Sequence, residues 1–308
     1  MSYALLFPGQ GAQAVGMGKE LAEAFPQSKK IFEQADALLE SSLSRLCWEG
    51  PAEELTRTEW CQPALYVTSL AALAALEAQG AKPLAPKAAA GLSLGEYTAL
   101  AAAGVFSFED GLRLVHLRGQ AMEEAARAQA GTMASVLGLE LPDLESLCVG
   151  TGAQVANINS PGQLVISGPT QAVQAVAERA KAKGAKRVIP LEVGGAFHSQ
   201  LMAPAGDRLK AAAASVVIRA PRFPVASNVT GAFHEGPDLV CQRLVEQLTR
   251  PVQWIACMQT LIQSGITLFI EMGSGSVLKG LAKKIDPGAQ VLSAGTADQI
   301  RDVARQLS

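Results

Sequence analysis

Gly91-Leu92-Ser93-Leu94-Gly95 follows the pattern Gly-x-Ser-x-Gly, which is typical of a nucleophile elbow. In such an elbow a strand turns sharply into a helix, and the serine hydroxyl is lifted out of the turn. Glycine flanks the serine because the chain crosses too closely for a Cβ atom. A short apolar segment, 86–90, precedes the pattern, and an alanine-rich segment, 96–106, follows it. We therefore expect a strand, a turn and a helix, with Ser93 as a candidate nucleophile.

The segments around this turn alternate between strand and helix patterns. Residues 3–7 and 267–271 are short and apolar, as buried strands are, whereas 62–79 and 108–128 have the length and pattern of helices. Strands that alternate with helices form a parallel sheet that helices cover on both faces. Together with the elbow, this alternation predicts a large α/β-hydrolase-like domain with a parallel sheet.

A different pattern begins near Ala130-Gly131. It predicts the order strand, helix, strand, strand, helix, strand, which is the ferredoxin-like unit. The expected elements lie at 132–139, 141–148, 155–158, 164–167, 170–183 and 187–193. We therefore expect a smaller ferredoxin-like subdomain at 128–197, inserted into a large catalytic domain that is formed by 1–127 and 198–308.

The bulk composition excludes several classes of protein. The 308 residues are 49% hydrophobic and 18% charged, which is typical of a soluble globular enzyme or binding protein. A net charge of −2 gives no support for binding to nucleic acid or to a membrane. No apolar run approaches the roughly 18 residues of a membrane span, and Met1-Ser2-Tyr3 carries no basic signal region. Five scattered cysteines predict free thiols and a cytoplasmic location.

A serine nucleophile needs an adjacent base, most often histidine, and this chain has three histidines. His116 lies within a predicted helix, where a packed structural role is expected, and His234 lies in a polar loop, where we expect it to be solvated. His198 lies in a glycine-rich turn just after a strand, where catalytic residues tend to cluster. We therefore expect His198 to be the base. No acidic residue stands in an evident relay position, so the third member need not be a carboxylate.

An oxyanion hole and an anion-binding side chain are the remaining candidates. In an elbow, one oxyanion donor is the backbone N–H of the residue after the nucleophile, here Leu94. The loop Pro8-Gly9-Gln10-Gly11 can supply the second donor, or it is only a tight turn. Arg118 interrupts an apolar helical face and offers a planar fork that matches a carboxylate, although most helical arginines are solvated.

Eight short motifs follow one another along the chain. They are Phe7-Pro8-Gly9-Gln10-Gly11, Gln62-Pro63-Ala64, Gly91-Leu92-Ser93-Leu94-Gly95-Glu96-Tyr97, Leu117-Arg118-Gly119, Asn159-Ser160-Pro161-Gly162-Gln163, Ala196-Phe197-His198-Ser199, Ser227-Asn228-Val229-Thr230-Gly231 and Pro251-Val252-Gln253-Trp254. In this order, and over nearly its whole length, the chain resembles the malonyl-CoA:acyl carrier protein transacylases. The ordered set is far more specific than any one of its motifs.

The resemblance implies an acyl transfer that proceeds through a malonyl ester of Ser93. His198 would be general base and then general acid, and the resemblance implies that Gln10 and Leu94 supply the oxyanion-hole amides. It further implies that Arg118 pairs with the free carboxylate of malonate. The donor would be malonyl-CoA, and the acceptor the phosphopantetheine thiol of acyl carrier protein, in a ping-pong reaction.

The resemblance also implies three further site residues. A backbone carbonyl in the Pro-Val-Gln-Trp segment, that of Gln253, would orient His198, which explains the missing carboxylate. Phe197 would accompany a preference for malonyl over methylmalonyl groups, because one methyl is worth roughly 1–3 kcal/mol in a pocket. Asn228, in the Ser-Asn-Val-Thr-Gly motif, would belong to the substrate site.

The expected partners are malonyl-CoA and an acidic acyl carrier protein, with no permanently bound cofactor, no metal, no nucleic acid and no membrane. We expect a monomer that serves fatty acid biosynthesis. Leu92 replaces the histidine that the family usually has before the nucleophile, which leaves open a free-standing acyltransferase of polyketide synthesis. The elbow and its base are also compatible with a serine hydrolase or thioesterase, and the fold with a non-catalytic carrier-binding module. A basic cluster is expected to border the carrier dock, and its members are Arg179, Lys181, Lys183, Lys186 and Arg187.

Overall fold

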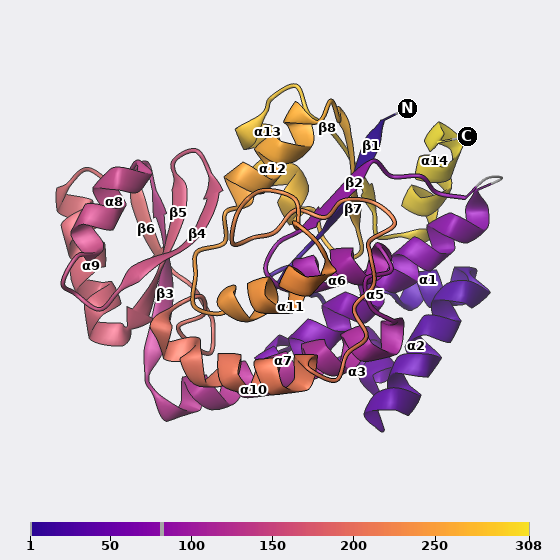
Figure 1. Cartoon of the computed structure of the whole chain (residues 1–308), viewed down its shortest axis with the longest axis horizontal. Helices are drawn as coiled ribbons and strands as arrows, with labels where there is room; N and C mark the ends of the chain where they lie inside the picture. Colours follow the sequence, from indigo (N-terminus) through magenta and orange to yellow (C-terminus); the bar gives the residue numbers. More distant parts are fainter. Residues whose placement is uncertain (1, 81–82, 308) are drawn as a thin grey trace.

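In the computed structural model, which describes residues 2–80 and 83–307, four parallel strands form the central sheet (Figure 1). In spatial order they are β2 (Ala88–Gly91), β1 (Tyr3–Phe7), β7 (Leu268–Met272) and β8 (Gln290–Ala294). Every pairing is parallel, and β1 and β7 are buried along their whole length, as strands covered on both faces are. The predicted parallel sheet is confirmed.

Helices cover both faces of this sheet. Because side chains alternate along a strand, Leu5 and Phe7 of β1 enter one core, and Ala4 and Leu6 enter another. The first core is completed by α5 (Thr58–Gln79), α6 (Leu94–Ala102), α7 (Phe108–Ala128) and α14 (Ala297–Leu307). The second core is completed by α12 (Trp254–Gln263) and α13 (Val277–Ile285).

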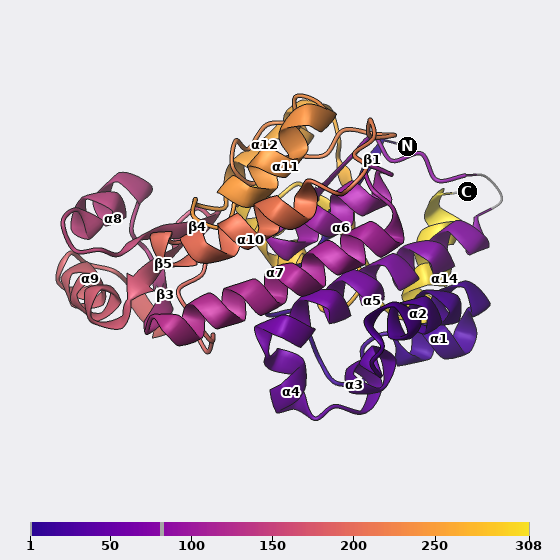
Figure 2. The ribbon, with the colours of Figure 1, turned by 60° about the horizontal axis from the view of Figure 1, so that its bottom comes forward.

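The remaining helices of the large domain pack on α5 and α7, apart from α11, which packs on α10. Figure 2 shows α10 running alongside α7, and α2 beside α5, in agreement with their packing contacts. These outer helices are α1 (Lys19–Ala24), α2 (Pro26–Leu39), α3 (Leu43–Glu49), α4 (Ala52–Thr56), α10 (Ala203–Ala213) and α11 (Pro237–Glu246). Within the described residues, no helix combines the length and apolarity that crossing a membrane requires.

A second, antiparallel sheet lies to one side of the first (Figure 1, left). Its order is β4-β5-β3-β6, with β3 (Gly131–Leu137), β4 (Gln154–Ser160), β5 (Gln163–Pro169) and β6 (Arg187–Pro190). Two helices, α8 (Leu141–Cys148) and α9 (Thr170–Ala182), pack on it around a separate apolar core. This arrangement has the connectivity of a ferredoxin-like unit, so the expected fold class is confirmed. The exact domain bounds, 1–127 with 198–308 and 128–197, stay a prediction.

The antiparallel sheet contacts two segments of the large domain through β4. Asn157 of β4 forms a parallel bridge with Val252, through hydrogen bonds of 2.9 Å on either side. The side chain of Gln154, also on β4, donates to the carbonyl oxygens of His198 and Thr249, at 3.2 and 3.1 Å. These contacts hold the segments that contain His198 and residues 249–252 against the antiparallel sheet.

Candidate active site

The elbow has the geometry that its sequence predicts. Ser93 has φ 54° and ψ −103°, a conformation that side-chain-bearing residues rarely adopt. A Cβ atom on Gly91 would lie 1.9 Å from the carbonyl of Gly95, and one on Gly95 would lie 2.0 Å from the carbonyl oxygen of Phe7. The chain therefore crosses itself and β1 at this turn, and only glycine fits at the two positions that flank the Leu92-Ser93-Leu94 segment. The helix α6 begins directly after Ser93, two residues earlier than expected.

Ser93 and His198 form a hydrogen-bonded pair. The Ser93 Oγ atom lies 2.8 Å from His198 Nε2, and His198 Nδ1 lies 2.7 Å from the carbonyl oxygen of Gln247. Because a carbonyl can only accept, Nδ1 carries the proton, which leaves Nε2 free to accept one from serine in the neutral ring. Burial, together with the charge of Arg118, lowers the pKa of His198 to about 4, although the bond to Gln247 opposes this. His198 is therefore neutral, and able to act as a base, at physiological pH.

The carbonyl that orients His198 belongs to Gln247, so the expectation for Gln253 is wrong. Gln247 follows the last residue of α11, where carbonyl groups have no partner inside the helix. Gln253 instead donates its backbone N–H to the carbonyl of Asn228, at 2.8 Å, and precedes α12. Any residue at a helix end can supply a carbonyl, so no side-chain signal in the sequence points to Gln247.

Arg118 is buried beside Ser93, with 1% of its surface exposed. Its guanidinium donates to Gln62 Oε1 at 2.6 Å, to Ser93 Oγ at 3.0 Å and to Gln247 Oε1 at 2.9 Å. All three partners are neutral oxygen atoms, so among the described residues no carboxylate is hydrogen-bonded to this cation. The guanidinium also lies over the ring of Tyr97, 5.2 Å from its centre. A desolvated arginine with only neutral partners is prepared to bind an anion.

A cavity of about 190 Å³ opens above these side chains, where the two sheets meet. Ser93, His198, Arg118, Gln10 and Phe197 all line it. Leu94 lines it too, and as the first residue of α6 it has a backbone N–H without a partner in the helix. The antiparallel sheet contributes further polar and apolar lining, which includes Asn157, Asn159, Gln163 and Val165.

Asn228 is not among the residues that line this cavity, and it supports the elbow from behind. It is fully buried, accepts a hydrogen bond from the backbone N–H of Ser93 at 2.7 Å and donates to the carbonyl of Gly91 at 2.8 Å. The assignment of Asn228 to substrate contact is therefore wrong, because both ends of its amide are used to hold the strained turn.

The other two histidines have different surroundings. His116 is packed, as expected, against the ring of Trp60, with ring centres 5.2 Å apart. The expectation that His234 is solvated is wrong, because its side chain is only 3% exposed. Its Nε2 atom lies 2.9 Å from Glu96 Oε1, and Glu96 is fully buried. The polar residues next to His234 in sequence suggest an exposed loop, whereas its partner Glu96 lies 138 positions away in the chain.

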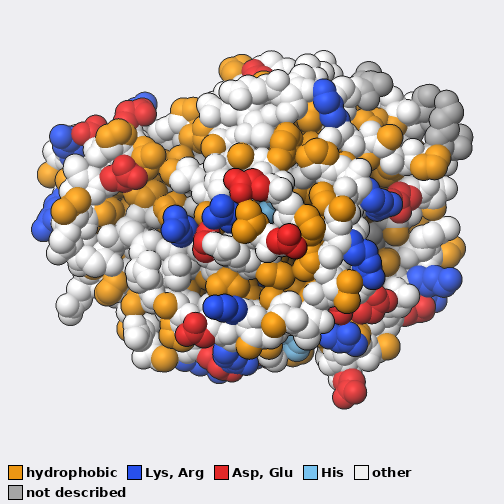
Figure 3. Space-filling view, viewed as in Figure 1, with side chains coloured by type: hydrophobic (Ala, Val, Ile, Leu, Met, Phe, Trp, Pro, Cys, Tyr) orange, Lys and Arg blue, Asp and Glu red, His pale blue; other side chains and the backbone are white. Residues whose placement is uncertain are grey.

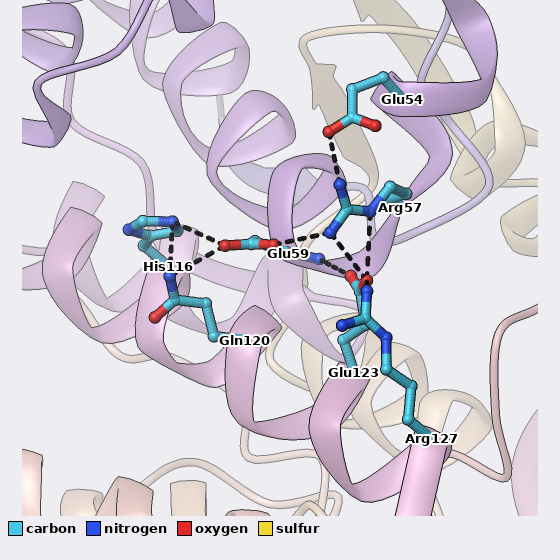
Figure 4. A network of polar contacts seen from close by, with 7 residues as sticks. All are labelled: Glu54, Arg57, Glu59, His116, Gln120, Glu123 and Arg127. Carbon is cyan, nitrogen blue, oxygen red and sulfur yellow. Dashed lines mark hydrogen bonds and ion pairs between the residues drawn. The ribbon is translucent and has the colours of Figure 1, made fainter.

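Figure 4 shows a second polar network on α4, α5 and α7, and none of its residues lines the cavity. Arg57 forms ion pairs with Glu54, Glu59 and Glu123. Glu59 lies 3.8 Å from His116, and its carboxylate also accepts from Gln120. This network fastens the start of α5 to the face of α7 that points away from the cavity.

Comparisons with known proteins show which family this chain resembles. The family model of the acyl transferase domain matches residues 4–298. The malonyl CoA-acyl carrier protein transacylase of Bacillus subtilis is 44% identical over 302 residues, which cover 96% of this chain and 94% of that protein. The transacylase of the same name from Coxiella burnetii has a solved structure that is similar with a TM-score of 0.96 and 38% identity, covering 100% and 98% of the two chains. A malonyl-transacylase solved with its type II polyketide acyl-carrier protein is similar with a TM-score of 0.95 and 36% identity, covering 99% and 100%.

Proposed function

Because this chain belongs to the acyl transferase family and is an acyl carrier protein S-malonyltransferase, with malonyl-CoA as substrate, we propose that Ser93 and His198 are its catalytic residues. The observation that carries this proposal is a single cavity in which Ser93 Oγ lies 2.8 Å from His198 Nε2 and 3.0 Å from Arg118. A candidate nucleophile, a neutral base and a cation thus line one cavity.

In the first half-reaction, Ser93 Oγ attacks the thioester carbonyl carbon of malonyl-CoA while His198 Nε2 accepts the hydroxyl proton. The resulting oxyanion is held by backbone N–H groups of Leu94 and Gln10, which both border the cavity. The C–S bond then breaks, and coenzyme A leaves as a thiol that takes the proton from His198. The product is a malonyl ester of Ser93.

The second half-reaction repeats these steps with a different thiol. The phosphopantetheine thiol of the carrier protein attacks the ester carbonyl and gives its proton to His198. Ser93 is then expelled and recovers that proton, which leaves a malonyl thioester on the carrier. The carbonyl of Gln247 keeps the imidazole in one tautomer throughout, and it stabilises the imidazolium that forms in each half-reaction.

Arg118 selects for a malonyl group by pairing with its free carboxylate. The guanidinium is already desolvated and fixed by Gln62 and Gln247, so little side-chain freedom is lost when the anion binds. Phe197, which is 5% exposed and lines the cavity, restricts the space beside the acyl group. We assign it the exclusion of a methyl branch.

Intact mass spectrometry tests the reaction directly. Incubation with malonyl-CoA is expected to add one malonyl group to Ser93, and holo acyl carrier protein is expected to remove it and gain the same mass. Ser93→Ala is the control that gains nothing. Rapid loss of the adduct to water would favour a serine hydrolase, and absence of any adduct on the unaltered chain would favour a carrier-binding module.

We further propose that the enzyme serves fatty acid biosynthesis in the cytoplasm, as a monomer. Five cysteines without disulfide bonds support a reducing compartment. The similarity to a transacylase of type II polyketide synthesis keeps that pathway as the second candidate. Comparison of the malonylation rates of fatty acid and polyketide carrier proteins distinguishes the two.

The predicted docking cluster at the end of α9 is partly neutralised. Lys181 pairs with Glu178 at 2.7 Å, and Lys183 pairs with Asp143 at 3.3 Å. On the face of the molecule in Figure 3, acidic and basic side chains are interspersed and form no single basic patch. The role of the cluster in docking an acidic carrier stays a prediction.

A further inference from the structure

Behind the elbow lies a buried carboxylate that the acyl-transfer steps do not use. Glu96 is on α6, three residues after Ser93, and is fully buried. Its Oε2 atom accepts from the backbone N–H of Asn228 at 3.1 Å and from Gln247 Nε2 at 2.6 Å. Its Oε1 atom accepts from His234 Nε2 at 2.9 Å. These three contacts offset part of the cost of burying a carboxylate.

Two of these three donors belong to the residues that hold the active site. Asn228 accepts from the backbone N–H of Ser93 at 2.7 Å, and Gln247 Nε2 also donates to the Ser93 carbonyl, at 3.0 Å. Gln247 further accepts from Arg118 through Oε1 and from His198 through its carbonyl oxygen. The Glu96 side chain therefore lies one contact away from the nucleophile, the base and the arginine.

We propose that Glu96 and His234 are positioning residues for acyl transfer. Glu96 fixes the side chain of Gln247 and the backbone of Asn228, and His234 fixes the second oxygen of Glu96. This inference rests on the proposed roles of Ser93, His198 and Arg118, and it adds the hydrogen bonds that hold these residues in place. A misplacement of about 1 Å at a reacting group can cost on the order of 100-fold in rate, which is the scale of effect expected here.

Two variants distinguish the hydrogen bonds of the Glu96 side chain from its carboxylate. Glu96→Ala removes both, and Glu96→Gln removes only the carboxylate. Alanine removes the acceptor of all three donors, and of these only Gln247 Nε2 keeps another partner, the Ser93 carbonyl. Glutamine keeps all contacts, because its oxygen accepts from Asn228 and Gln247, and its amide N–H₂ donates to His234. The imidazole can accept at Nε2 by moving its proton to Nδ1, which has no hydrogen-bond partner within the described part of the chain.

The measurement is the first-turnover rate of Ser93 malonylation by rapid quench and intact mass spectrometry, with melting temperatures recorded in parallel. We expect Glu96→Ala to lose about 100-fold in this rate at saturating malonyl-CoA, and Glu96→Gln to stay within about threefold of the unaltered chain. Equal losses in the two variants would overturn the proposal, as would an unchanged rate in folded Glu96→Ala.

His234→Ala tests the same hydrogen-bonded group of residues even where Glu96→Ala does not fold. It removes one of three donors, so we expect a loss of about tenfold, and an unchanged rate would overturn the proposal. The Glu96→Ala/His234→Ala double variant should be no slower than Glu96→Ala, because His234 acts only through Glu96. An additive further loss would count against the proposed coupling.

The chain contains a matched control in its other histidine–glutamate pair. Glu59→Ala and His116→Asn alter the pair in Figure 4, which lies outside the cavity. Even where their melting temperature falls as much as that of Glu96→Ala, they should change the acylation rate less than about twofold. If they slow acylation as much as Glu96→Ala does, the effect is general destabilisation and the proposal is overturned. Failure of the unaltered chain to form the adduct would instead reject the proposed function itself.

Discussion

Arg118→Ala gives the sharpest test of how this site recognises its acyl group. The substitution removes the donor to Ser93 Oγ, and with it the contacts to Gln62 and Gln247, whichever acyl-CoA is bound. It also removes the partner of the malonyl carboxylate, and that loss applies to malonyl-CoA alone. The ratio of kcat/KM for malonyl-CoA to kcat/KM for acetyl-CoA therefore isolates the charge pair from the structural contacts.

The expected size of the change follows from the burial of the guanidinium. Removal of one partner of a desolvated charge pair costs about 2–5 kcal/mol, which corresponds to a fall of about 30-fold to several thousandfold in that ratio. Because the charge of Arg118 contributes to the low pKa of His198, the variant should also raise this pKa from about 4. The acidic limb of its pH–rate profile should then move to higher pH.

The assay is the initial rate of adduct formation at Ser93 with each acyl-CoA, measured from about pH 4 to about pH 8, a range that spans the folded-state and ordinary pKa values of histidine. Arg127→Ala is a matched control, since Arg127 lies on the same helix, pairs with Glu123 and does not line the cavity. Both measurements should be unaffected in this control. A malonyl-to-acetyl ratio in Arg118→Ala within twofold of the unaltered chain would refute the assignment of Arg118 to the carboxylate.

Four further outcomes are expected. The acylation rate of the unaltered chain should stay constant as the pH falls from 7 and decline only as the pH approaches about 4, since burial lowers the pKa of His198. A pH–rate profile in which the rate already falls near pH 6.5 would contradict this. Asn228→Ala should lower kcat by about tenfold or more with little change in the KM for malonyl-CoA, because it frees the Ser93 turn without touching substrate; a rise in KM alone would restore a substrate role. Gly95→Ala should lower the free energy of unfolding by about 3 kcal/mol or more in urea titrations, because its Cβ meets the Phe7 carbonyl; a loss below about 1 kcal/mol would show that the crossing can open. Arg179→Glu/Lys183→Glu should raise the KM for carrier protein and leave that for malonyl-CoA unchanged; an unchanged carrier KM at low salt would reject the predicted dock.

The sequence pointed to the proposed nucleophile and base because both have distinctive signals. Ser93 lies between two glycines after an apolar strand, and a choice among three histidines left His198. Both sheets could be predicted because short apolar strand segments are distinct in the sequence from the longer helical segments. Arg118 could be named from its place on an apolar face, but its three neutral partners could be known only from the structure.

The supporting residues could not be predicted, for two physical reasons. Gln247 orients His198 through a backbone carbonyl, a group that every residue has. Glu96, Asn228 and His234 are polar residues that are buried by contacts more than 130 positions apart in sequence, whereas local composition around His234 suggests a solvent-exposed loop. Hydrogen-bond partners at this separation depend on the tertiary fold, and a local sequence pattern does not predict them.

The left-handed backbone of the two proposed catalytic residues has a practical consequence for engineering. Ser93 and His198 have φ values of 54° and 55°, in a region where glycine is free of the strain that a side chain introduces. Replacement of either residue by glycine would relieve that strain while abolishing turnover. Variant libraries ranked by thermal tolerance alone would therefore enrich inactive sequences at these two positions, and directed evolution of this scaffold has to select for acyl transfer in the same round.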